Sequence, residues 1–285
     1  MEHQRAISIL VLLIAVASGI AAAAGIFSGG GPGPFELETV RGTTVTIHGQ
    51  GLYRHMSWDV AVQGIGQDVV TLFIAVPALL AALVFARRGS VRARLLLAGV
   101  LGYFHVTYLF YLVMGAYNPL FLVYAALAGM SFFGLALSLL GFDLVRLPKA
   151  YQPTAPTRLA GGFLIFNTVA IALMWLGVVV PPLLDGSIYP AEVQHYTTLI
   201  VQGLDLGLLL PLCMVTAILL LRGRPMGYLL APVYLVFLSF LMTALVAKII
   251  GMGLVGAEIV PAVFVIPTIL IVTIGTTVAL FRKIA

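Results

Sequence analysis

Two aspartates lie inside long apolar segments of this chain, where an ionisable side chain is costly and is therefore a candidate for function. Asp68 precedes the basic turn at Arg87 by 19 residues, and Asp205 precedes Arg222 by 17 residues. In helices these spacings correspond to rises of about 28 Å and 25 Å, at 1.5 Å per residue. Both carboxylates are therefore expected near the end of a span opposite its basic turn, where they could bind a proton or a cation.

Each aspartate has a polar neighbour three residues away, on the same helix face. Thr71 follows Asp68, and Gln202 precedes Asp205. The first patch also contains two glutamines, Gln63 and Gln67. Two acids that meet in a poorly solvated site repel each other, so one of them can retain a proton. The patches predict a binding site for a proton or a small solute. The alternative is that both acids face interfacial water or bond to neighbouring helices.

A histidine lies near the middle of another apolar segment. His105 follows Arg94 by 11 residues, a rise of about 16 Å, which places it close to the bilayer centre. A neutral imidazole there could relay a proton, bind a cofactor or hydrogen-bond a substrate, together with Tyr108. The same stripe contains aromatic and small residues, namely Phe104, Tyr111 and Gly115. The alternative is a buried histidine bonded to a tyrosine hydroxyl. Bis-histidine haem binding is disfavoured, because the apolar segments contain no second histidine.

The remaining polar groups inside apolar segments are lesser candidates. Lys248 follows Arg224 by 24 residues, so we expect it at the outer edge of its span, with its ammonium reaching water or pairing with Glu258 or Asp205. That depth disfavours a Schiff-base lysine. Asn167 is expected to hydrogen-bond across helices. Three further candidates are Tyr234, Ser239 and Thr243. Three aromatic residues are expected to be interfacial anchors: Tyr117, Trp58 and Tyr196.

The composition decides what elements must position these residues. Of the 285 residues, 61% are hydrophobic and 9% are charged, against about 45–50% and 25% in soluble domains. A soluble enzyme, a disordered chain and a nucleic-acid-binding protein are thereby excluded. The sequence lacks HExxH, CxxC, GxSxG and a phosphate-binding glycine loop, so no cofactor or metal is indicated. Cys213 is the single cysteine, so no intrachain disulfide can form.

Eight apolar runs are long enough to cross a bilayer. They cover about 6–27, 60–86, 95–116, 119–141, 159–183, 198–221, 226–250 and 257–281. Alternating loops place 12 of the 15 Lys and Arg residues on one side, leaving Arg41, Arg54 and Lys248 on the other. The eight runs predict an all-α, multi-pass protein of the plasma (inner) membrane. The positive-inside rule predicts that both of its termini are cytoplasmic.

The first run has an alternative interpretation. Arg5, an apolar stretch and the small residues 21–25 also resemble a signal peptide with a cleavage site. The run is longer than a usual signal-peptide core, so we expect it to be retained as a span.

The two halves of the chain match without a gap when shifted by 134 positions. The matched pairs are Pro77 with Pro211, Arg88-Gly89 with Arg222-Gly223, and Leu95-Leu96 with Leu229-Leu230. Asp68 then aligns with Gln202, and Thr71 with Asp205. Four spans in each half predict a parallel repeat of two four-helix units, 1–150 and 151–285. Chance similarity between Leu-rich and Ala-rich segments is the alternative.

Residues 28–57 form a polar loop on the predicted outer side. After a Gly- and Pro-rich linker, Phe35, Leu37, Val45 and Ile47 alternate with polar residues around a turn at 41–43, which predicts a β-hairpin. Ser57 is expected to cap the next helix. The hairpin could act as a lid or form a packed surface loop. His48 and His55, with Glu36 or Asp59, match no zinc spacing, so a metal site is disfavoured.

Three classes of function follow from these patterns. The leading hypothesis is a small-solute or proton-linked transporter, or a membrane-embedded binding protein, that uses Asp68 and Asp205. The second is an intramembrane enzyme or redox protein that acts on a lipid or quinone at His105. The third is a sensor or assembly subunit with the outer hairpin as its partner surface. The expected partners are the lipid bilayer and a small-molecule or lipid ligand, with no nucleic acid.

Overall fold

The computed structural model describes residues 3–285 and contains, within them, eight helical spans that are long and apolar enough to cross a membrane. The helices are α1 (Gln4–Phe27), α2 (Trp58–Val70), α3 (Val76–Arg87), α4 (Val91–Val113), α5 (Phe121–Leu140), α6 (Thr157–Asp185), α7 (Ile200–Leu204), α8 (Leu210–Leu221), α9 (Pro225–Leu254) and α10 (Ala262–Phe281). The pairs α2/α3 and α7/α8 are each one continuous span, joined by a π-helical segment. The predicted all-α multi-pass membrane protein is therefore confirmed.

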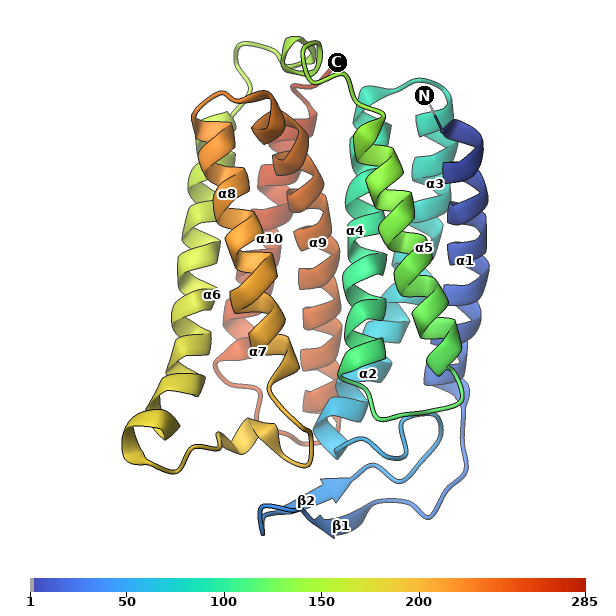
Figure 1. Ribbon diagram of the computed structural model, residues 1–285, viewed down its shortest axis with the longest axis vertical. Coiled ribbons are helices and arrows are strands. Elements are labelled where there is room, and N and C mark those ends of the chain that lie inside the picture. Colours follow the sequence, from blue (N-terminus) through green and yellow to red (C-terminus); the bar gives the residue numbers. More distant parts are fainter. Residues whose placement is uncertain (1–2) are drawn as a thin grey trace.

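The spans form two groups that meet at α4 and α9 (Figure 1). One group contains α1 to α5 and the other contains α6 to α10. The start of α1 and the C-terminus lie at the same end of the bundle, and the hairpin lies at the opposite end (Figure 1). An even number of spans requires this arrangement.

Small residues permit the closest helix contacts between the two groups. A Cβ added to Gly99 of α4 would lie 2.4 Å from Cβ of Val236 and 2.8 Å from the carbonyl oxygen of Val233, both in α9. A Cβ added to Gly66 of α2 would lie 3.0 Å from the backbone N and Cα of Lys248. Because Gly66 and Gly99 have no side chain, the backbones of α2 and α4 can approach α9 closely.

The predicted hairpin is confirmed. Strands β1 (Phe35–Glu38) and β2 (Thr44–Ile47) are antiparallel, with Phe35 opposite Ile47 and Leu37 opposite Val45. The side chain of Ser57 does not form the expected helix cap. Its hydroxyl instead lies 3.3 Å from that of Tyr196, because the 186–199 loop of the second group folds over the start of α2.

Several element boundaries recur at the offset of 134 residues. Both π-helical segments, Thr71–Ala75 and Asp205–Leu209, follow this offset, as do the ranges of α3 and α8 and the first residues of α4 and α9. Each π-helical segment ends two residues before the matched proline, whose missing N–H leaves an earlier carbonyl without its helical donor. The shared feature favours the predicted repeat. Superposition of the two four-helix halves is its direct test.

We expect both termini to be cytoplasmic and the 186–199 loop to face outward. Reporter fusions at the C-terminus and at Gly186 should give opposite signals, because basic residues cluster in the loops at the termini's end. A C-terminal reporter that is active only outside the cell would contradict the topology.

Replacing Gly99 with Ala is expected to lower stability by about 1–3 kcal/mol, because the new methyl group would overlap α9. Gly129→Ala in α5 is the matched control, since a Cβ there meets nothing within 4 Å. Thermal unfolding in detergent measures both variants. Equal midpoints for the two variants would contradict close packing of α4 on α9.

Candidate functional site

Asp68 is buried, with an exposed fraction of 1%, and faces the protein interior. The Tyr53 hydroxyl donates a hydrogen bond of 2.5 Å to Oδ2, and the Tyr111 hydroxyl lies 3.0 Å from Oδ1. A Cβ added to Gly25 of α1 would overlap this carboxylate, so α1 covers it directly. Removal of α1 would therefore uncover Asp68, which makes the first span part of the site's enclosure.

Tyr53 belongs to the loop between β2 and α2, outside the membrane spans. Its burial, reinforced by the nearby Asp68 carboxylate, raises the pKa of this phenol well above its ordinary value. The hydroxyl therefore stays protonated and remains a hydrogen-bond donor. Tyr53 was not predicted as a site residue, because it lies in a loop and reaches a helical residue 15 positions later in the sequence.

Thr71 faces a neighbouring network rather than Asp68. Its hydroxyl donates to the Gln67 carbonyl at 2.9 Å or shares a bond of 2.9 Å with the Tyr103 hydroxyl. The Gln67 amide donates to Tyr103 at 2.9 Å and to Thr107 at 3.0 Å. These groups are buried, and they join α2 to α4. The expected Asp68–Thr71 pair is thus two adjacent polar groups with different partners.

Asp205 opens the second π-helical segment and is half-buried. The indole N–H of Trp175, in α6, donates to its Oδ2 at 2.7 Å. Gln202, the expected neighbour, is buried but does not line the cavities described below. Trp175 was missed in the sequence because a tryptophan inside an apolar run resembles any other core residue.

Lys248 was predicted to extend from the outer edge of its span, and this is wrong. Its backbone packs on Gly66, and its side chain lines two cavities inside the bundle together with Asp205. One of these cavities is also lined by Tyr111, whose hydroxyl bonds to Asp68. Among residues 3–285, the ion pair within 4.0 Å joins Arg146 to Asp143, so the expected Lys248 pairs with Glu258 or Asp205 are not formed at that distance.

Two cavities share the wall that contains Lys248 and Asp205. The interface cavity, of about 210 Å³, lies between the two groups of helices. The second-half cavity, of about 320 Å³, lies among α6, the α7/α8 span, α9 and α10. Their shared polar residues are Gln63, Trp175, Asp205 and Lys248. The charged groups therefore lie where a solute could contact both groups of helices.

The interface cavity is lined by residues that correspond at the offset of 134. The corresponding pairs are Gln67 with Val201, Tyr103 with Phe237, Thr107 with Leu241, Tyr111 with Leu245, and Met114 with Lys248. If the halves are repeats, this cavity lies on the axis that relates them. At four of these five pairs the first half has a polar side chain and the second an apolar one, and at the fifth Met114 corresponds to Lys248.

Asn167 was expected to bond across helices, but its Oδ1 is buried with no hydrogen-bond partner among the described residues. Its side chain lines the second-half cavity, which also contains Glu258. A buried unpaired amide oxygen is costly unless a ligand or water donates to it. The other lesser candidates are bonded within the protein: Tyr234 to the Leu209 carbonyl, Ser239 to the Leu235 carbonyl and Thr243 to the Ser239 carbonyl.

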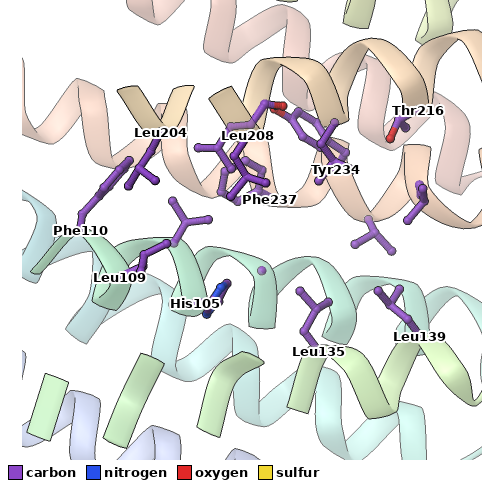
Figure 2. Close-up of a pocket in the computed structure, with 16 residues that line it drawn as sticks. His105, Leu109, Phe110, Leu135, Leu139, Leu204, Leu208, Thr216, Tyr234 and Phe237 are labelled. Atoms are coloured by element: carbon purple, nitrogen blue, oxygen red, sulfur yellow. The ribbon is translucent and has the colours of Figure 1, made fainter. Parts of the chain in front are cut away.

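His105 and Tyr108 do not form one site. The Nδ1 of His105 lies 3.1 Å from the carbonyl oxygen of Ala128, so the tyrosine partner considered in the sequence analysis is replaced by a carbonyl. The Tyr108 hydroxyl faces α1, 3.4 Å from the Ser18 carbonyl. His105 instead lines an apolar pocket between the two groups of helices (Figure 2).

A polar network links the two groups at the end that carries the hairpin. The Arg41 guanidinium donates to the Gln194 carbonyl at 3.1 Å, and the Gln194 amide donates to Asp59 at 3.0 Å. The Tyr196 hydroxyl accepts from the Ser57 N–H at 3.3 Å. Tyr196 therefore contacts the first group of helices, whereas Tyr117 remains 78% exposed.

Comparisons with protein-family models, with curated proteins and with solved structures find no match for this chain. Within residues 3–285, no three His, Cys, Asp or Glu side chains are arranged to hold a metal ion.

Acidification is expected to release the 186–199 loop from the first group of helices. Burial lowers the pKa of His195, despite opposing effects from its bond to the His55 carbonyl and from Asp59. The free loop then binds a proton more readily than the docked loop, so docking is favoured above about pH 6.5, the ordinary histidine pKa, and weakens below it. Because one proton is involved, the equilibrium constant for docking of the loop changes at most about tenfold per pH unit.

Hydrogen exchange of this loop, corrected for intrinsic exchange rates, measures the effect. His195→Gln keeps a side-chain donor without titrating near neutral pH and should remove the pH dependence. His55→Gln is the matched control, because the contact uses the His55 backbone carbonyl. Identical pH dependence in the wild type and His195→Gln would contradict this assignment.

Proposed function

We propose that this protein is a proton-linked transporter of a small polar solute in the plasma membrane. The observation that carries the proposal is the position of Lys248, which lines a cavity between the two groups of helices together with Asp205 and with Tyr111, a hydrogen-bond partner of Asp68. Charged groups inside a membrane protein are costly and occur mainly on substrate, ion or proton pathways.

The charge balance of this cluster favours uptake of a positive charge. Two carboxylates and one ammonium carry one net negative charge when all are ionised. The cluster becomes neutral when it binds one proton or one cationic group of a solute. Because isolated charge is poorly tolerated in an apolar bundle, proton binding and solute binding at this cluster are expected to influence each other.

The groups around the cluster suit a small solute with both charged and hydrogen-bonding parts. Asn167 offers an unpaired acceptor, and Gln63 offers an amide that can donate or accept. Trp175 occupies one oxygen of Asp205 and leaves the other free for a ligand. A zwitterion would place its ammonium on Asp205 and its carboxylate on Lys248.

The alternatives receive less support. An enzyme acting on a lipid or quinone would use His105, but the Tyr234 hydroxyl in that pocket is already bonded to a backbone carbonyl. A sensor or assembly subunit would use the hairpin surface, where Thr46 bonds to Glu36 within the hairpin and Arg41 bonds to the neighbouring loop.

Transport is tested in proteoliposomes that contain an internal pH indicator. Single amino acids, monocarboxylates, primary amines and guanidines are added one class at a time. We expect one class to produce proton movement in the wild type. Asp205→Asn and Lys248→Met should each reduce uptake at least about tenfold, because loss of a buried charged contact costs about 2 kcal/mol or more.

Two exposed residues provide matched controls. Asp143→Asn and Lys149→Met make the same chemical changes outside the cavities and should leave uptake unchanged. Asp205→Asn should also make the residual uptake independent of pH. The proposal fails if no class moves protons, or if the cavity variants behave like their controls.

A further inference from the structure

A separate apolar pocket of about 170 Å³ lies between the two groups of helices. Figure 2 shows His105 and Leu109 of α4 along one wall, with Leu208, Tyr234 and Phe237 of the second group along the other. Most of its lining is Leu, Val and Phe, so it lacks the charges of the interface cavity. Its position within the membrane spans makes a molecule dissolved in the bilayer the natural occupant.

His105 gives this pocket one defined hydrogen-bonding group. Its Nδ1 lies 3.1 Å from the Ala128 carbonyl, which can only accept, so Nδ1 carries the proton. In a neutral imidazole, Nε2 is then an acceptor without a hydrogen. His105 has no other hydrogen bond among the described residues, so a ligand with a hydroxyl group could donate to Nε2.

Thr216 is a second polar group of this pocket, at the end away from His105 (Figure 2). Its side chain is fully buried and lines the same pocket, yet its hydroxyl has no hydrogen-bond partner in residues 3–285. Buried hydroxyl groups are rarely left unpaired. Water is a poor occupant, because a stable buried water needs two to four polar partners and this lining is apolar.

We propose that this pocket binds a membrane-soluble phenol whose hydroxyl group donates to Nε2 of His105. The volume suits one aromatic ring, since an apolar cavity of about 150 Å³ binds benzene. The ring would pack among Leu109, Leu208 and Phe237. The proposal does not rest on transport, because it concerns a different cavity and a direct binding measurement tests it.

The experiment compares 4-tert-butylphenol with its methyl ether, 4-tert-butylanisole, by calorimetry with the protein in nanodiscs. The two probes have similar apolar bodies, and only the phenol can donate a hydrogen bond. Empty nanodiscs give the concentration of each probe in the lipid, to which each affinity is referred. We expect the phenol to bind roughly three- to tenfold more tightly than the ether.

Variants assign this preference to the pocket. His105→Phe removes the acceptor and should bind both probes with equal affinity. Leu109→Trp should fill the pocket and abolish binding of both, whereas Leu173→Trp, on the exposed side of α6, should change neither. Leu109→Trp still tests the pocket if His105→Phe fails to fold. Equal affinities in the wild type, a preference that persists in His105→Phe, or undiminished binding by Leu109→Trp would overturn the proposal.

Discussion

The structure depends on the cost of holding an ammonium and two carboxylates inside an apolar helical bundle. Asp68 and Asp205 come from different groups of helices, and Lys248 lines a cavity with Asp205 and with Tyr111, which bonds to Asp68. The close approach of α2 and α9 at Gly66 is what brings Lys248 to this position. Hydrogen bonds from Tyr53 and Trp175 stabilise the carboxylates. Contacts between the groups therefore serve an electrostatic requirement as well as apolar packing.

The interface cavity has two chemically different walls. At corresponding positions, the first half has Gln67, Tyr103, Thr107 and Tyr111, and the second has Val201, Phe237, Leu241 and Leu245. The polar side chains of the first half are largely bonded to one another. The second wall contributes apolar surface together with Trp175, Asp205 and Lys248. A bound solute would therefore meet an ordered polar wall on one side and, on the other, a largely apolar wall that contains Asp205 and Lys248.

The spans were predictable because a bilayer requires about 20 apolar residues for each crossing, which is a local property of the sequence. The hairpin was predictable from side-chain alternation, and Asp68 from its apolar surroundings. Lys248 was misplaced because its distance from Arg224 gives depth but does not say which helix it faces. Tyr196 and Asn167 were misassigned for the same reason. Their contacts depend on packing between segments far apart in the sequence.

The two prolines connect this packing to the site. At position 211 the missing N–H leaves a preceding carbonyl free, and the turn before it widens into a π-helical segment that begins at Asp205. One additional residue in a helix rotates everything before it by about 100°, since a turn contains 3.6 residues. A regular α-helix would therefore direct Asp205 to a different face from the one that meets Trp175. The proline fixes the orientation of the carboxylate from six residues away, so local backbone chemistry and the electrostatic cluster are parts of one arrangement.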